Sequence, residues 1–389
     1  MKPIIKWIVV VLVALAICGI FLLVAIQVNR VMEYPDFLVY WAAGKLIGQG
    51  QSPFVAEVFK VLMGELNWSF AYPMVTGIFF VPWGLMPYRL AYLTWIFLSM
   101  VLILSSVLLL VRASKINNPY PYLLPIIAGV ATFRPVIVAI RNGQIVPFLL
   151  FALVLTIFFF QKDKPILSGV MCSVLIFKPS IGLPIMGLIA LWYLVNRQYK
   201  AFIALGLGSI FLFSVGFLIE PQWIRQVLSY EGNQTIIGRF RFCPTFWGLA
   251  NLACSDRMTC VYTVGTILSL AALGVFGFAL FTRRTDIFSV ASLAASISLL
   301  ISPYAWTYEH VLLVVPILFI FGALVHRSAP FIVSALIFLL FSILSIILLF
   351  VGVEISLDMW SGFLPLTCFV GTLLLTWRGT TIDIRGGIT

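Results

Sequence analysis

Asp36 is the residue of this chain best placed to act as a general base. It lies just past the end of the first long apolar run, within the segment YPDFLVYW. A carboxylate beside a cavity at a membrane surface can take the proton from a hydroxyl group. The alternative is a helix N-cap, because Asp is favoured at that position and Pro35 precedes it here. The two roles are compatible, and position alone favours them about equally.

Arg141 begins a short polar turn, RNGQ, which also contains Asn142 and Gln144. An arginine can bind a phosphate through two parallel N–H groups, so this turn could hold an anionic substrate. The alternative for Arg141 is a snorkelling side chain that reaches the lipid headgroups, and without further information that alternative is the better one.

Two other cations fall in or beside apolar segments. Arg134 lies within an apolar run, where a charge costs about 2.5–3.5 kcal/mol on insertion scales, so we expect it to face protein, water or ligand. Lys178 lies in LIFKPS, where Pro179 and Pro184 interrupt the helical pattern. Broken helices at membrane depth line cavities, although a snorkelling Lys is somewhat favoured by position alone.

The segment SPYAWTYEH places Tyr308, Glu309 and His310 at the start of another apolar run. A histidine there could donate to a phosphate or orient a substrate. The alternative is that these residues belong to an aromatic belt at the membrane surface.

Arg239 and Arg241 alternate with Phe in GRFRFCP, a pattern that suits binding of an anionic lipid headgroup. The alternative is a general attraction of these arginines to bulk anionic lipid. The six Cys residues show no metal-ligand spacing. A disulfide between Cys254 and Cys260 is plausible in an oxidising compartment, where it would be structural.

Composition decides the class of protein. Of the 389 residues, 62% are hydrophobic and 10% are charged, whereas about 25% charged is usual for soluble domains. A soluble core cannot hide so much apolar surface, and a disordered chain would not contain it. We therefore predict an all-α polytopic membrane protein, formed by residues 1–389 as one integral membrane domain.

Twelve apolar runs predict about twelve transmembrane helices, although several are shorter than the usual span of about 20 residues. The runs are Ile4–Val28, Tyr88–Val111, Tyr120–Ile140, Ile145–Phe160, Pro165–Phe177, Ile181–Val195, Ala201–Ile219, Met258–Phe281, Ile287–Ile301, Val311–Val325, Pro330–Val351 and Met359–Trp377.

The net charge of +11 indicates how the chain is oriented in the membrane and does not indicate binding to nucleic acid. With both termini in the cytoplasm and Tyr72–Met86 read as an interfacial helix, Lys and Arg exceed the acids in the inner loops. The loops QKDK and NRQYK are examples, and the outer side is then balanced. This arrangement follows the positive-inside rule.

Two outer loops are long, at residues 29–87 and 220–257. In the first, DFLVYWAAGKLIGQG predicts an amphipathic helix ended by Gly48 and Gly50, and FAYPMVTGIFFVPWGLMP predicts a second helix lying in the membrane interface. Most of the unusual polar residues collect on this outer face, which therefore carries the predicted chemistry.

These segments, taken in order, resemble glycosyltransferase family 87, the bacterial polyprenyl-phosphate-mannose-dependent mannosyltransferases of the GT-C fold. The resemblance rests on DFLVYWAAGKLIGQGQSPF, AYPMVTGIFFVPWGLMP, the Gly-Gln of RNGQIVPFLLF, the Lys-Pro of LSGVMCSVLIFKPS, and SPYAWTYEH. It covers the chain roughly from Asp36 to His310, and the last two runs carry no motif of the family.

The resemblance implies a catalytic Asp in the first outer loop, which Asp36 matches. It implies a donor phosphate held by basic residues, for which the candidates are Lys178, Arg141, Arg239, Arg241 and His310. Some members have adjacent histidines where this chain has Glu309-His310, so only His310 could fill that role. The remaining lining of the substrate pocket is assigned to Asn142, Gln144, Tyr308, Glu309, Tyr40 and Tyr72.

The resemblance further implies transfer of a sugar, mannose in that family, from a polyprenyl phosphate to a lipid or glycan hydroxyl at the outer face of the bacterial inner membrane. A single carboxylate acting as base implies inversion at the sugar carbon. RNGQ lacks an acidic pair that could hold a metal, so no metal or other cofactor is expected. The alternatives are a twelve-helix transporter, for which Arg134 within a span is the argument, and a non-catalytic lipid-binding scaffold.

Overall fold

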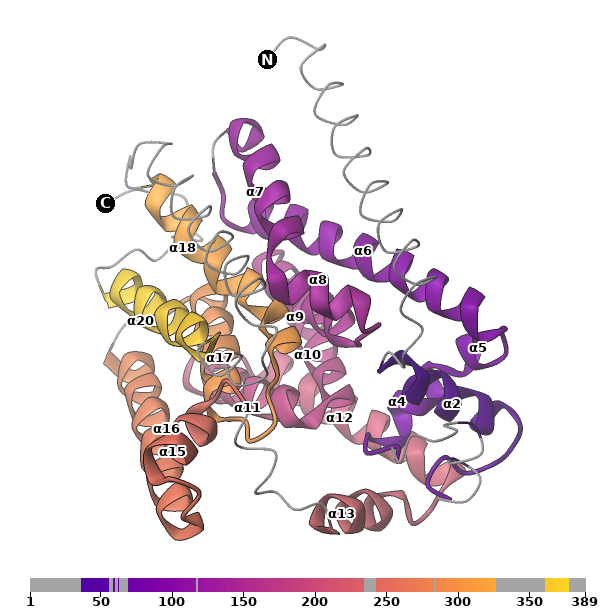
Figure 1. Ribbon diagram of the computed structural model, residues 1–389. Coiled ribbons are helices and arrows are strands. Elements are labelled where there is room, and N and C mark those ends of the chain that lie inside the picture. The colour runs from indigo at the N-terminus through magenta and orange to yellow at the C-terminus, as the bar shows by residue number, and fades with distance from the viewer. Residues whose placement is uncertain are drawn as a thin grey trace.

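The computed structural model describes residues 36–55, 59, 62, 69–116, 118–233, 243–282, 285–326 and 361–377. Within these residues every regular element is a helix, as the composition predicts (Figure 1). The elements are α2 (Phe37–Gly48), α4 (Met74–Phe79), α5 (Val81–Gly84), α6 (Tyr88–Ala113), α7 (Tyr120–Thr132), α8 (Arg134–Arg141), α9 (Val146–Gln161), α10 (Pro165–Ser173), the 3-10 helix η1 (Val174–Phe177), α11 (Pro179–Val195), α12 (Tyr199–Ile219), α13 (Trp223–Asn233), α15 (Phe246–Cys254), α16 (Met258–Thr282), α17 (Ile287–Ile301), the 3-10 helix η2 (Thr307–Leu313), α18 (Val314–His326) and α20 (Phe363–Trp377).

Four continuous helical stretches of the described chain are long and apolar enough to cross a membrane: Tyr88–Ala113, Tyr199–Ile219, Met258–Thr282 and Thr307–His326. The pair α7 and α8, bent by 56°, makes a fifth candidate. The chain is therefore a polytopic membrane protein. The runs 4–28 and 330–351 lie outside the described residues, and the other runs coincide with helices. Several of these helices are shorter than a full span, so the number twelve stays a prediction.

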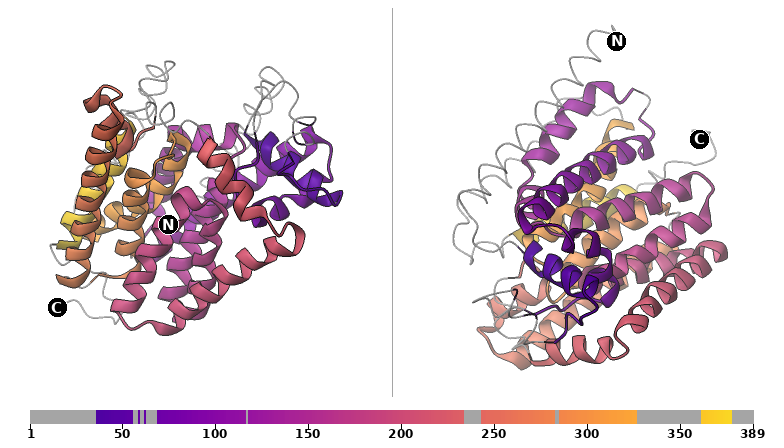
Figure 2. Two further views of the ribbon diagram at one scale, coloured as in Figure 1. Left: turned by 90° about the horizontal axis from the view of Figure 1, so that it is seen from below. Right: turned by 90° about the vertical axis from the view of Figure 1, so that its right-hand side faces the viewer.

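The centre of the bundle is α17, whose residues from Ile287 to Leu300 are all buried. It contacts α11, α18, α20, α9 and η2. By contrast, α12 and α16 lie at the periphery (Figure 2) and expose large apolar side chains, with Leu218 of α12 at 85%. Apolar surface of this kind is what a helix facing lipid presents.

The first long loop forms a group of short helices, α2, α4 and α5, beside the start of α6 (Figure 1). The helix predicted from DFLVYWAAGKLIGQG is confirmed and ends at Gly48, but the prediction that it is amphipathic is wrong. Its buried residues run from Val39 to Gly44 without a break, so protein surrounds it on most sides. The second predicted helix is two short ones, α4 and α5, that meet at Phe80.

Two glycines allow these short helices to touch backbone to backbone. A Cβ atom at Gly44 of α2 would overlap the Phe80 carbonyl oxygen between α4 and α5, and one at Gly84 would overlap the Lys45 nitrogen. The glycines therefore set the distance between α2, which begins just after Asp36, and the neighbouring helices.

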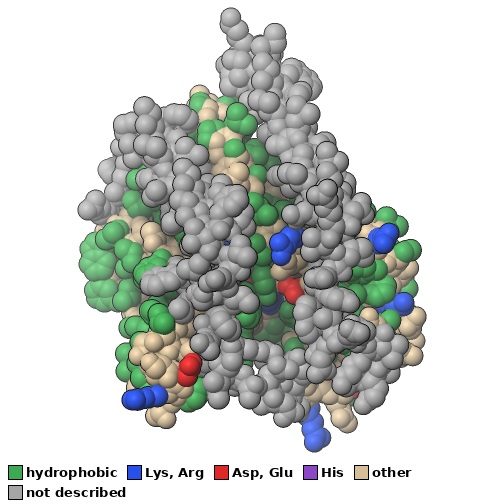
Figure 3. Space-filling model, in the orientation of Figure 1, with side chains coloured by type: hydrophobic (Ala, Val, Ile, Leu, Met, Phe, Trp, Pro, Cys, Tyr) green, Lys and Arg blue, Asp and Glu red, His purple; other side chains and the backbone are tan. Residues whose placement is uncertain are grey.

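The second long loop contains α13 and α15, and residues 234–242 between them lie outside the described residues. On the face of the molecule in Figure 3, the described charged side chains are few and stand among apolar surface.

We expect Gly44→Ala to lower the free energy of unfolding by about 1–3 kcal/mol, because the added methyl group forces α2 away from Phe80. Thermal unfolding in detergent measures the change. Gly187→Ala on α11 is the matched control, because no atom lies within 4 Å of its added Cβ. Equal melting temperatures for the two variants would contradict the close-contact explanation.

Candidate functional site

Asp36 immediately precedes α2, and its side chain is held by the turn between α8 and α9. The carboxylate oxygen Oδ2 accepts hydrogen bonds from Nε2 of Gln144 and, at 3.4 Å, from Nδ2 of Asn142. Asp36 stands at the N-cap position of α2 but makes no side-chain capping hydrogen bond. The side chain is thus directed to the RNGQ turn instead of to the helix backbone.

The backbone of that turn is fixed against α2 and α6. The Phe37 amide donates to the Asn142 carbonyl at 3.0 Å, and Nε1 of Trp95 donates to the Gly143 carbonyl at 2.9 Å. Gly143 has a φ of +61°, and a Cβ atom there would lie 2.6 Å from the Cβ of Phe37. Only glycine meets both conditions, and it brings the amides of the turn to Asp36.

Lys178 lies at the break between η1 and α11 and is only 5% exposed. Its Nζ atom is 2.7 Å from Oε1 of Glu309 and donates to Oε1 of Gln144 at 3.3 Å. The ammonium also lies 4.9 Å from the ring centroid of Tyr308, a cation–π distance. Lys178 therefore points into the protein, and the snorkelling alternative is excluded.

Sequence reasoning missed two hydroxyl side chains that hold the backbone on either side of Lys178. Oγ1 of Thr76 donates to the Phe177 carbonyl at 2.7 Å, and Oγ of Ser298 donates to the Ile181 carbonyl at 2.6 Å. A single Thr or Ser in an apolar helix gives no signal of such a long-range contact. The break between the helices is thus stabilised by α4 and α17.

Glu309 belongs to η2 and is fully buried. Its second oxygen, Oε2, accepts a hydrogen bond from the backbone N–H of Trp306. The ion pair at Oε1 and the backbone hydrogen bond at Oε2 together offset much of the free-energy cost of burying this carboxylate. Glu309 is therefore the direct partner of Lys178.

Two tyrosines complete the group. The Tyr40 hydroxyl lies 3.2 Å from Oε1 of Gln144 and 3.1 Å from the Tyr72 hydroxyl. The Tyr72 ring is also 5.9 Å from the Lys178 ammonium. The structure brings together eight residues singled out from the sequence, which we call the Asp36 cluster: Asp36, Tyr40, Tyr72, Asn142, Gln144, Lys178, Tyr308 and Glu309.

The electrostatics of the cluster are set by burial. Burial raises the pKa of the Asp36 carboxyl above its ordinary value, and the Gln144 amide, the Lys178 ammonium and the Asn142 amide each offset part of that rise. With Lys178 charged and both carboxyls ionised, the cluster carries one net negative charge.

Three groups of candidate residues fall elsewhere. Arg141 ends α8 with an exposed side chain. His310 is fully buried and lies near Arg134, which is itself buried at the bend between α7 and α8. Arg239 and Arg241 lie outside the described residues. Among the described residues, no three His, Cys, Asp or Glu side chains are grouped so as to hold a metal ion.

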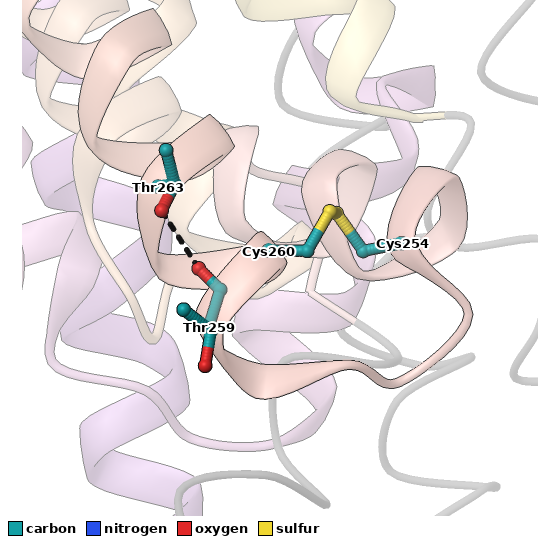
Figure 4. The surroundings of a disulfide bond; sticks show 4 residues. All are labelled: Cys254, Thr259, Cys260 and Thr263. Carbon is teal, nitrogen blue, oxygen red and sulfur yellow. Dashed lines mark hydrogen bonds between the residues drawn. A yellow bond between two sulfur atoms is a disulfide. The ribbon is translucent and has the colours of Figure 1, made fainter.

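The predicted disulfide is present. Cys254 at the end of α15 is bonded to Cys260 near the start of α16 (Figure 4). It joins the two helices across the turn that contains Asp256, whose side chain accepts a hydrogen bond from Asn251 at 2.8 Å.

A protein-family model, glycosyltransferase family 87, matches residues 70–303, more than half of the chain. The chain belongs to glycosyltransferase family 87. The resemblance seen in the ordered motifs is thereby confirmed, and family membership favours an enzyme over a transporter or a scaffold. The match contains Tyr72, Asn142, Gln144 and Lys178, whereas Asp36 lies before it and Glu309 after it. No curated protein and no solved structure matches this glycosyltransferase.

We expect Lys178→Met to lower the free energy of unfolding by about 3–5 kcal/mol, because it leaves the Glu309 carboxylate buried without its partner. The double variant Lys178→Met/Glu309→Gln is expected to recover much of the loss, because no unpaired charge remains. Thermal unfolding in detergent distinguishes the three proteins.

Lys200→Met is the control, since Lys200 is exposed at the start of α12. A single variant Lys178→Met as stable as Lys200→Met would show that the ion pair does not support the fold.

Proposed function

We propose that this glycosyltransferase transfers a sugar, mannose in the first instance, from a polyprenyl phosphate to a hydroxyl of a lipid or glycan acceptor. The observation that carries the proposal is the Asp36 carboxylate, partly exposed and held by side-chain amides in the membrane-embedded chain. It is the kind of base that an acceptor hydroxyl needs.

The reaction is a single displacement. The acceptor oxygen forms a bond to the anomeric carbon as its proton passes to Asp36, and the bond from that carbon to the phosphate oxygen breaks. The bonding electrons leave with the polyprenyl phosphate. Glu309 is engaged by Lys178 and by the Trp306 backbone, so Asp36 is the carboxylate of the cluster that serves as base. One base and one displacement give inversion.

Charge balance bears on how the donor phosphate is held. Lys178 pairs directly with Glu309 and is linked to Asp36 only through Gln144, so its single positive charge is already matched by Glu309. A phosphodiester at the cluster needs further cations, and fixed positive charge near a leaving group lowers the barrier. Exposed Arg141, one residue before Asn142, is the described side chain best placed to supply it. Arg239 and Arg241 are further cations proposed for the donor site, whereas His310, fully buried near Arg134 and outside the cluster, is not assigned to it. The scheme uses no metal or cofactor.

The reaction is proposed to occur at the outer face of the bacterial inner membrane, with both termini cytoplasmic. The excess of Lys and Arg in the opposite loops supports this orientation. The Cys254–Cys260 disulfide supports it independently, because disulfides persist in oxidising compartments.

We expect Asp36→Asn to slow release of polyprenyl phosphate from synthetic polyprenyl-phosphate-mannose by about 10²–10⁴-fold, because the general base is lost. Binding of the donor is expected to remain. The assay presents the purified protein with a panel of lipid and glycan acceptors. Asp163→Asn, an exposed residue between α9 and α10, is the matched control. Full turnover by Asp36→Asn would rule out its role as base.

We expect a membrane-impermeant maleimide to label Cys254 and Cys260 in intact spheroplasts once an impermeant reductant has opened their disulfide. The other described cysteines, Cys172, Cys243 and Cys368, are buried. Labelling is read by mass shift, and a Cys254→Ser/Cys260→Ser variant provides the background. If labelling requires permeabilised membranes, the α15–α16 turn faces the cytoplasm and the outer-face proposal fails.

A further inference from the structure

The Asp36 carboxylate is held through one of its two oxygen atoms. Both amide donors, from Asn142 and Gln144, reach Oδ2. The side chain makes no capping bond to α2, and no described residue donates a hydrogen bond to Oδ1. The two oxygens of this carboxylate are therefore not equivalent.

Gln144 can present only one end of its amide to Asp36. Its Oε1 atom lies 3.3 Å from the Lys178 ammonium and 3.2 Å from the Tyr40 hydroxyl. An ammonium group has three donors and no acceptor, so Oε1 must face Lys178 and the NH₂ group must face Asp36. The reversed amide would set NH₂ against the ammonium and oxygen against the carboxylate, which is repulsive at both ends.

The orientation of Gln144 in turn depends on the buried ion pair. Lys178 is held at 2.7 Å by Glu309, and its backbone is held between η1 and α11. The amide is thus oriented by groups from η2 and from the helix break, while Gln144 itself follows α8. Asn142 makes the longer contact, so its hold on Asp36 is weaker.

We propose that Gln144 is a positioning residue that anchors Oδ2 of Asp36 and thereby presents Oδ1 to the acceptor hydroxyl. The catalytic use of Oδ1 rests on the proposed function, whereas the anchoring of Oδ2 does not. Without Gln144 the carboxylate turns about its side-chain bonds, and the oxygen that takes the proton no longer has a fixed direction.

The anchoring also changes the acidity of Asp36, which gives a readout that a purely structural residue would not move. A hydrogen bond donated to the charged form lowers a carboxyl pKa, so loss of the donor raises the pKa. The titratable groups that face Asp36 from the surrounding elements are Tyr40 of α2, Tyr72 before α4, Lys178 before α11, and Tyr308 and Glu309 of η2.

The test is an infrared pH titration of the purified full-length protein, without donor or acceptor. The carbonyl band of protonated Asp36 is assigned by its loss in Asp36→Asn. In the unchanged protein we expect the midpoint to lie above the ordinary Asp value of 3.8, since burial raises the pKa. In Gln144→Met, which has a similar volume and no amide, we expect the midpoint to rise further by about one pH unit or more.

Two controls make the result specific. Gln161→Met removes an amide that donates to the Ala113 carbonyl and makes no hydrogen bond to Asp36 or to its described partners. It should leave the Asp36 midpoint unchanged. Asn142→Ala should raise the midpoint less than Gln144→Met does. The proposal would be overturned if the midpoint in Gln144→Met stayed unchanged, or if Gln161→Met raised the midpoint by the same amount as Gln144→Met.

If Gln144→Met does not fold, Gln144→Glu replaces it. That variant keeps acceptors for Tyr40 and Lys178 and sets a second carboxyl against Asp36, so the higher of the two coupled carboxyl midpoints should lie above the midpoint of the unchanged protein, because two neighbouring carboxylates cannot both ionise easily. A higher midpoint equal to that of the unchanged protein would overturn the proposal. The sugar-transfer assay is run beside the titration. A shifted midpoint in Gln144→Met together with no transfer by the unchanged protein contradicts only the proposed function. Transfer by the unchanged protein together with an unshifted midpoint in Gln144→Met contradicts only the role of Gln144.

Discussion

The ion pair between Lys178 and Glu309 is the interaction on which the rest of the site depends. Both side chains are almost fully removed from solvent, and withdrawing each charge from water costs several kcal/mol. That cost is tolerable only because the two charges lie 2.7 Å apart and make further hydrogen bonds, to Gln144 and from the Trp306 backbone. The ion pair therefore fixes where the helix break before α11 meets η2. Gln144, which is hydrogen-bonded to Lys178, takes its position from this ion pair.

The cluster uses places where helices end or break. Asp36 precedes α2, Asn142 and Gln144 follow α8, Lys178 separates η1 from α11, and Glu309 lies in a 3-10 turn before α18. The helices themselves are almost wholly apolar, as a membrane requires. At a break, backbone carbonyls lack helical partners, and the hydroxyls of neighbouring helices can satisfy them. A polar site is thus compatible with an apolar bundle because it is confined to these interruptions.

Much of this arrangement could be predicted from composition and from polar residues at the ends of apolar runs. Asp36, Gln144 and Lys178 were each identified in that way, and the order of the motifs indicated the family. The pairing of Lys178 with Glu309 could not, because the two residues are far apart in the chain and either could have faced lipid headgroups. The burial of α2 was also missed, since its apolar composition is equally typical of a helix that lies in the membrane interface.

The construction of the cluster has a consequence for biosynthesis. Gln144 lies 108 positions after Asp36, and Glu309 follows Lys178 only after several further helices. Because a membrane protein is inserted from its N-terminus onward, Lys178 enters the bilayer before Glu309 has been synthesised. Until η2 has been synthesised, the Lys178 ammonium therefore lacks the Glu309 carboxylate that pairs with it in the folded protein. The site can be completed only after this late segment is in place. A nascent chain that stalls before η2 retains Lys178 as an unpaired cation, whereas in the finished protein Lys178 is buried and paired.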